Sequence, residues 1–167
     1  TWANHEPLVG SSGLALERYP YYDPATRAVD FDRMHSHLAG LPAGAVVLLH
    51  ACCHNPTGAD LSPDQWRNIA ELVEKRGLVP FVDLAYQGLG TDLEVDVAGA
   101  RLIAERVPEM LLAISCSIET RVRISLVLSD SAFHLRTFTM TPRSVEKNGG
   151  STRNFRNLSQ LGSMTPI

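Results

Sequence analysis

The 167-residue sequence lacks the features that mark several large classes of protein. It has no apolar run of 18 or more residues, so we expect no membrane-spanning helix. It has no strong excess of one charge, with 15 Lys and Arg against 18 Asp and Glu, and therefore gives no indication of a nucleic-acid or membrane partner. No Gly-x-Gly-x-x-Gly follows a predicted strand, which disfavours a dinucleotide-binding fold. No internal repeat is visible either.

Cysteine is also scarce. The chain has three cysteines, an odd number, and two of them, Cys52 and Cys53, are adjacent and badly placed to pair with each other. No charged and then apolar leader opens the sequence, so we expect no secretory signal. Together these features predict a reducing, cytoplasmic setting. The chain starts at Thr1 without an initiator Met, as expected of a piece cut from a longer protein.

Short apolar runs alternate with amphipathic stretches of helical length. We expect buried strands at three runs: 45–49, 78–82 and 110–114. Between the first two lies a helix over 63–76, predicted from Ser62 as N-cap, Pro63 at the first helical position and Gly77 at the end. Strand–helix–strand alternation of this kind predicts an α/β fold with a largely parallel sheet.

Other segments give weaker signals. Apolar spacing predicts helices over 31–38, with Asp30 as cap, and over 93–107. Weak alternation suggests a strand within 13–19.

The composition changes near Ile118. Residues 1–118 carry 8 Lys and Arg against 15 Asp and Glu, whereas residues 119–167 carry 7 against 3. Residues 121–128 fit a strand, but residues 137–167 are rich in Ser, Thr, Arg and Asn and are left unassigned or disordered. We therefore expect two regions, 1–117 and an aberrant tail, 118–167.

Two short motifs follow the first two predicted strands. Asn55-Pro56-Thr57-Gly58 comes after the run 45–49, and Asp83-Leu84-Ala85-Tyr86 comes after the run 78–82. Polar groups at the carboxyl ends of neighbouring parallel strands are typical of ligand sites in α/β sheets. The pair, with a strand–helix–strand spacing between its members, resembles the class I pyridoxal-phosphate-dependent aminotransferases, in their aspartate/aromatic branch.

The resemblance implies a fold and several residue roles. Residues 1–117 would form part of the large, cofactor-binding domain of a fold type I transferase, a three-layer αβα structure with a mostly parallel sheet. Asp83 would face the pyridine nitrogen of pyridoxal phosphate and keep it protonated, so that the ring acts as an electron sink. Tyr86 and Asn55 would hydrogen-bond the phenolic oxygen, with a cis peptide bond before Pro56.

Four further positions match cofactor contacts of the family. Trp2 would stack on the ring, and His5 would lie behind Asp83. Ser115 and Ser117 match the run that precedes the family's Schiff-base lysine, and the first of them would contact the cofactor phosphate. We expect Trp2, Asn55, Asp83, Tyr86 and Ser115 to converge on one pocket.

The sequence departs from the family pattern directly after Ser117. Ile118 stands where the lysine should be, and Leu126 stands where an arginine should pair with the phosphate; Arg121 and Arg123 are nearby but out of register. Without the lysine, the proton shuttle of transamination is lost. A frame shift would explain the basic, aperiodic tail, and a pseudo-enzyme or an assembly error are the alternatives.

The family resemblance also implies partners. Amino groups would pass between aspartate, glutamate or aromatic amino acids and 2-oxo acids, in a homodimer, although this chain itself is expected to be inactive. The alternative is a non-catalytic fragment or pseudo-enzyme that docks on a full-length partner, because a partial sheet has exposed edges.

A metal site is a rival interpretation of His50-Ala51-Cys52-Cys53-His54. Thiolates and imidazoles suit zinc. No second ligand cluster accompanies this run, and His35 and His37 have an unrelated spacing on a predicted helix. The sequence therefore predicts no metal centre.

Overall fold

The computed structural model contains a five-stranded sheet in the order β3-β4-β5-β6-β7. The structure describes the backbone of residues 1–116, 121–128 and 134–140, and the side chains of residues 1–114. The strands are β3 (Val46–His50), β4 (Val79–Leu84), β5 (Glu109–Cys116), β6 (Arg121–Leu128) and β7 (His134–Met140). A separate two-stranded sheet pairs β1 (Tyr22–Asp23) with β2 (Ala28–Val29).

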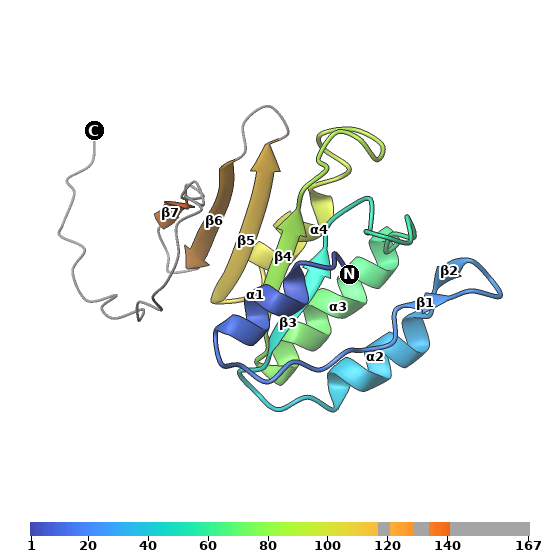
Figure 1. Ribbon diagram of the computed structural model, residues 1–167. Helices are drawn as coiled ribbons and strands as arrows, with labels where there is room; N and C mark the ends of the chain where they lie inside the picture. Colours follow the sequence, from blue (N-terminus) through green and yellow to red (C-terminus); the bar gives the residue numbers. More distant parts are fainter. Residues whose placement is uncertain (117–120, 129–133, 141–167) are drawn as a thin grey trace, which may run out of the picture.

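The three strands predicted from the apolar runs pair in parallel, as expected. β3 pairs with β4 and β4 with β5, so their carboxyl ends share one edge of the sheet. β6 and β7 then add antiparallel strands. The described sheet is therefore parallel on one side and antiparallel on the other (Figure 1).

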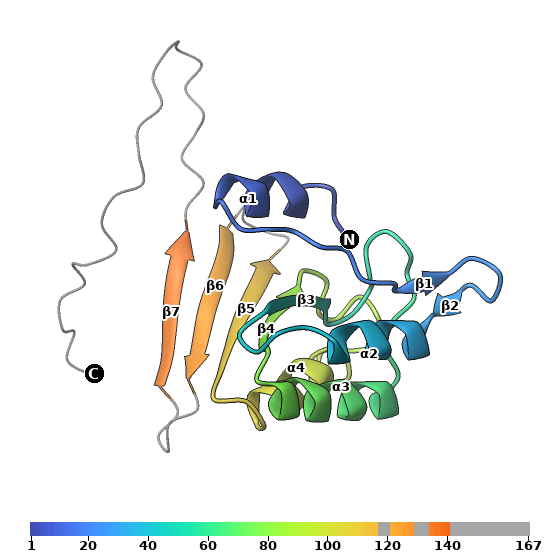
Figure 2. The ribbon, with the colours of Figure 1, turned by 90° about the horizontal axis from the view of Figure 1, so that it is seen from below.

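Helices lie on both faces of the parallel half. Figure 2 shows α3 (Pro63–Arg76) and α4 (Ala98–Ala104) on one side of the sheet and α1 (His5–Ser11) on the other, so the three-layer αβα prediction is confirmed. α2 (Phe31–Ala39) lies beside α3. None of the helices in the described residues is both long and apolar enough to cross a membrane.

The ends of α3 follow the predicted signals. The Ser62 side chain accepts a hydrogen bond from the Gln65 N–H, and the Gln65 side chain accepts one from the Ser62 N–H, which completes a capping box. Gly77 ends the helix in the left-handed conformation, with φ of 61°.

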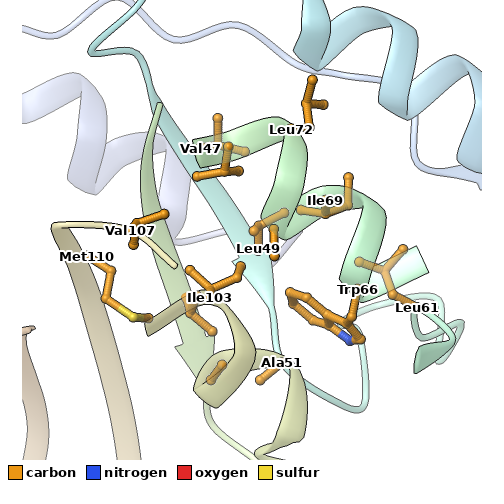
Figure 3. Close-up of a cluster of buried hydrophobic side chains, with 14 of the residues drawn as sticks. Val47, Leu49, Ala51, Leu61, Trp66, Ile69, Leu72, Ile103, Val107 and Met110 are labelled. Atoms are coloured by element: carbon orange, nitrogen blue, oxygen red, sulfur yellow. The ribbon is translucent and has the colours of Figure 1, made fainter. Parts of the chain in front are cut away.

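The hydrophobic core fills the space between the sheet and the pair α3 and α4 (Figure 3). Alternation along β4 turns Val82 and Leu84 into this core and leaves Asp83 on the opposite face, toward α1. The buried side chains drawn in Figure 3 include Val47, Leu49, Trp66, Ile69, Ile103 and Met110.

Three sequence predictions of secondary structure need correction. Residues 13–19 form no strand. The predicted helix over 93–107 is only seven residues long, because the Asp92 carboxylate accepts the N–H groups of Glu94 and Val95 and holds the preceding segment in turns. Residues 137–140, for which the sequence predicts no element, belong to β7. The predicted strand over 121–128 is confirmed as β6. Residues 141–167 lie outside the described part of the chain.

Candidate functional site

Asp83 is the centre of a polar cluster at the carboxyl edge of the parallel strands. It is paired in register with His50, the last residue of β3. Its Oδ2 atom lies 3.3 Å from Nε2 of His5 and 3.8 Å from Nδ1 of His50. The cluster thus joins two adjacent strand ends to the first turn of α1.

Thr1 and Trp2 complete this cluster. Oγ1 of Thr1 lies 2.6 Å from Nδ1 of His5 and 3.1 Å from Nε2 of His50, so one hydroxyl contacts the outer nitrogens of both rings. The Trp2 ring packs edge-on against His5, with 5.6 Å between the ring centroids, and is 44% exposed. Trp2 therefore presents aromatic surface to solvent beside His5, the partner of Asp83.

Burial governs the charges in the cluster. It raises the pKa of the Asp83 carboxyl, and the adjacent His5 opposes that shift. It lowers the pKa of His5 against the pull of Asp83. Burial, with added repulsion from His54 and His5, lowers the pKa of His50 to about 3. At neutral pH His50 is therefore an uncharged imidazole.

The loop that follows β3 is held by Asp60. Its two carboxylate oxygens accept the N–H groups of Cys53 and His54 at 2.7 and 2.8 Å. Nδ1 of His54 lies 2.8 Å from Oγ1 of Thr57, and the Asn55–Pro56 bond is cis, as the resemblance implied. These contacts fix the backbone on both sides of Asn55.

Asn55 and Tyr86 line one open cleft of about 430 Å³. The other lining residues are Cys53, His54, Pro56, Gly58 and Leu89. Tyr86 lies two residues past the end of β4 and is 38% exposed, so its side chain is accessible from this cleft. Both motifs from the sequence therefore meet at the same edge of the sheet.

A row of rings connects the cleft with the Asp83 cluster. His54 stacks on Tyr21 at 3.9 Å between centroids and meets His50 edge-on at 4.5 Å, and His50 lies 5.6 Å from His5. The structure thus brings His5 to Asp83, with Trp2 packed on His5, and brings Asn55 and Tyr86 to one cleft. These two groups are neighbours through the His50–His54 contact.

The serines lie at or beyond the limit of the described side chains. Ser115 is in β5, one residue past the Leu84–Ile114 pairing, so its backbone lies at the carboxyl edge next to the end of β4. Ser117 and Ile118 lie outside the described residues. The register pairs Leu126 with Leu111, several residues back from that edge, and pairs Arg121 with Cys116 at the edge.

Sequence reasoning missed the roles of Thr1 and His50 in the cluster. The sequence pattern presents His50 only as a possible zinc ligand with Cys52, Cys53 and His54. In the structure Cys52 is buried and burial raises the pKa of its thiol to about 12, so it is a protonated core side chain. The sequence does contain one signal for this cluster: His50 and Asp83 each directly follow an apolar run. The carboxyl ends of neighbouring parallel strands lie at one edge of the sheet, so residues in these two positions come close together.

Comparisons with known proteins agree with this arrangement. The family model described as aminotransferase class I and II matches residues 1–118. The chain belongs to this family. An aromatic-amino-acid aminotransferase of Paracoccus denitrificans is 55% identical over 117 residues, which is 70% of this chain and 30% of that protein. Proteins named aspartate aminotransferase also match.

Two further matches extend the comparison. An aromatic-amino-acid aminotransferase of Burkholderia pseudomallei, solved covalently bound to pyridoxal phosphate, superposes with a TM-score of 0.68 at 46% identity, over 69% of this chain and 29% of that one. A tyrosine aminotransferase of Klebsiella pneumoniae is 40% identical over 161 residues, 93% of this chain and 41% of that protein, so its alignment includes residues beyond Ile118. The chain thus spans about 30% to 41% of the length of these relatives.

Proposed function

We propose that this chain is part of the large domain, residues 1–117, of a pyridoxal-phosphate-dependent aminotransferase of the aspartate/aromatic branch. The whole protein would move an amino group between aspartate, glutamate or aromatic amino acids and 2-oxo acids. The observation that carries this proposal is the Asp83 carboxylate, held by His5 at the carboxyl end of β4 beside the cleft of Asn55 and Tyr86. The family membership supports it.

The donor set fits the ring of pyridoxal phosphate. Asp83 would face the pyridine nitrogen, with His5 as its second partner, and a cationic ring nitrogen would favour the ionised carboxylate that burial alone disfavours. Asn55 and Tyr86 would donate hydrogen bonds to the phenolic oxygen, and Trp2 would cover the ring face. Ser115 would contact the phosphate, and Ser117 would be a further cofactor-binding position. When bound, the cofactor supplies an electron sink at the carbon that gains or loses the amino group.

The two groups that would anchor the cofactor, a lysine and a phosphate-binding arginine, are not at their expected positions in this chain. The chain has Ile118 and Leu126 where a lysine and an arginine are needed, so neither a covalent bond nor a bidentate guanidinium–phosphate contact is available. We propose that this chain binds the cofactor weakly and does not catalyse transamination, with residues 118–167 an aberrant tail. The intact protein would be a homodimer in the cytoplasm, in keeping with the free thiols of Cys52 and Cys53.

The test is a titration of the full chain with pyridoxal phosphate, followed by absorbance and by quenching of Trp fluorescence. We expect weak, reversible binding that Asp83→Asn weakens further, because the amide cannot balance the charge on the ring nitrogen. Asp64→Asn is the matched control, since that carboxylate is 80% exposed on α3. Equal binding by both variants would contradict the role of Asp83.

A second arm tests the anchor. Borohydride treatment should leave no reduced adduct on the chain as it stands, and the double variant Ile118→Lys and Leu126→Arg should acquire one at position 118. An adduct at Lys75 or Lys147 in the unmodified chain would show a replacement lysine and overturn the proposed inactivity. Turnover of aspartate or tyrosine with 2-oxoglutarate by the unmodified chain would do the same.

A further inference from the structure

We propose that Asp96 is a positioning residue for Tyr86: its carboxylate holds the turn that begins at Tyr86 and so sets where the Tyr86 ring lies in the cleft. Asp96 itself is not among the residues that line this cleft. The effect on cofactor binding rests on the proposed function, whereas the placement of Tyr86 does not.

The backbone after Tyr86 turns back on itself. The carbonyl of Tyr86 accepts the N–H of Leu89 at 3.0 Å, and Gly88, the third residue of this turn, has φ of 87°. A type II turn requires a positive φ at its third position, and glycine adopts that φ without steric cost. Leu89 lines the same cleft as Tyr86, so this turn is part of the cleft wall.

The Asp96 carboxylate fixes the turn with three hydrogen bonds. Its Oδ2 atom accepts the N–H groups of Gly88 at 2.8 Å and of Gly90 at 2.9 Å, and its Oδ1 atom accepts the N–H of Thr91 at 2.8 Å. Hydrogen bonds to an ionised acceptor are roughly twice as strong as neutral ones. Asp96 is only 5% exposed, so water competes little for its oxygen atoms.

Asp96 is in turn attached to the packed helices. It lies two residues before α4, and α4 packs on α3 through Gly99 and Trp66. The contact with the turn is also close, since a Cβ atom at Gly90 would lie 2.7 Å from Oδ1 of Asp96. Asp96 therefore connects the helix layer to the turn that carries Tyr86.

The tyrosines differ in how their side chains are held. The Tyr19 hydroxyl donates a hydrogen bond to the Leu48 carbonyl, and the Tyr21 hydroxyl donates one to the Ala59 carbonyl. Among the residues whose side chains the structure describes, the Tyr86 hydroxyl has no such partner, and the residue is 38% exposed. The position of the Tyr86 ring therefore depends on its backbone, which the turn and Asp96 fix.

NMR of the full 167-residue chain with ¹³C-labelled tyrosine rings tests this placement without any cofactor. The chain has four tyrosines, and Tyr86→Phe identifies the Tyr86 signal by its loss. Asp96→Asn should shift that signal toward its position in the unfolded chain. In either orientation, the new amide turns its NH₂ group toward at least one of the three N–H donors, so at least one hydrogen bond is lost. The signals of Tyr19 and Tyr21 should not change.

Gly90→Ala is a second variant that disturbs the same contact. It keeps Asp96 and all three donors, but its methyl group displaces the carboxylate, so the Tyr86 signal should shift in the same direction. Asp23→Asn is the matched control, because that carboxylate accepts the N–H of Ala25 at 2.9 Å in a different turn and should not affect Tyr86.

Two results would overturn the proposal. One is an unchanged Tyr86 signal in folded Asp96→Asn or Gly90→Ala. The other is an equal shift of the Tyr19 and Tyr21 signals, which would indicate a general loss of stability. If Asp96→Asn does not fold, Gly90→Ala decides alone.

A titration with pyridoxal phosphate then measures whether the effect reaches the cofactor. Tyr86→Phe should weaken binding roughly 10- to 100-fold, the worth of one hydrogen bond to a charged oxygen. Asp96→Asn should weaken binding by up to the same factor, with little further effect in the Tyr86→Phe background, because it acts through the Tyr86 hydroxyl. Equal losses in both backgrounds would contradict this route. A chain that binds no cofactor would contradict the proposed function, and the ring signals of the cofactor-free chain would still decide the role of Asp96.

Discussion

Replacing Gly99 by alanine should destabilise the fold through a direct overlap with Trp66. A Cβ atom at Gly99 would lie 2.3 Å from Cε2, 2.4 Å from Cδ2 and 2.7 Å from Nε1 of the Trp66 indole. Non-bonded carbon atoms prefer separations of about 3.5–4.0 Å. Trp66 is only 6% exposed and lies between α3 and α4, so the ring cannot move away without shifting a helix (Figure 3).

The magnitude follows from two opposing effects. In an open helix position, Gly→Ala stabilises by roughly 0.5–1 kcal/mol because glycine loses more backbone entropy on folding. Inserting a methyl group into a packed core costs roughly 1–3 kcal/mol. The overlap at Gly99 is more than 1 Å, so the second effect should dominate, with a net loss of about 1–2 kcal/mol in the free energy of unfolding.

Urea unfolding followed by circular dichroism measures this difference. Gly10→Ala is the matched control, because it lies in α1 with no atom within 4 Å of the new Cβ and should be neutral or slightly stabilising. Trp66→Phe, a smaller ring, should reduce the cost of Gly99→Ala in a double-mutant cycle. If Gly99→Ala proves as stable as the original chain, the close packing of α4 on α3 is refuted.

Three further predictions concern the scaffold, each measured by urea unfolding. Ser62→Ala should cost about 1 kcal/mol through loss of the capping box, and an equally stable variant would show that the cap does not matter. Ile69→Ala should cost about 2–5 kcal/mol, because the side chain is fully buried, and a loss under 1 kcal/mol would contradict the packing. Hydrogen bonds from the N–H groups of Thr91, Gly90 and Gly88 lower the pKa of Asp96 below 3.8, so its stabilisation is present above that pH and lost as the pH falls through the folded-state value. Asp96→Asn should therefore destabilise at pH 7 and not in strong acid, and a pH-independent effect would refute this.

The sheet could be predicted because each parallel strand is a continuous apolar run. The structure shifts the first run, 45–49, by one residue to Val46–His50. This shift of one residue matters, because it places His50 at the end of β3, where it pairs with Asp83. Strand limits depend on the partner strand, which a single sequence does not display.

The motifs predicted the positions of Asn55, Asp83 and Tyr86 at the strand ends, but not how they group. The cluster of Thr1, His5 and His50 around Asp83 depends on α1 crossing the far face of the sheet, and no periodicity in residues 1–19 indicates that path. The antiparallel strand β7 was missed for a similar reason: residues 134–140 alternate too weakly to reveal a strand that is defined by its pairing with β6.

The position of α1 and the polar cluster are two aspects of one arrangement. α1 has no buried residue, so little apolar burial holds it over the sheet. Its described polar contacts with the sheet run from His5 to Asp83, and Thr1, just before it, contacts His50. A ligand that binds Asp83 and His5 would therefore also fix α1, and at 100 times its dissociation constant it would add about 2.7 kcal/mol to the folded state. Without a ligand, the same polar contacts must hold α1 alone. α1 is therefore the part of the described fold whose stability depends most on the ligand bound at Asp83 and His5.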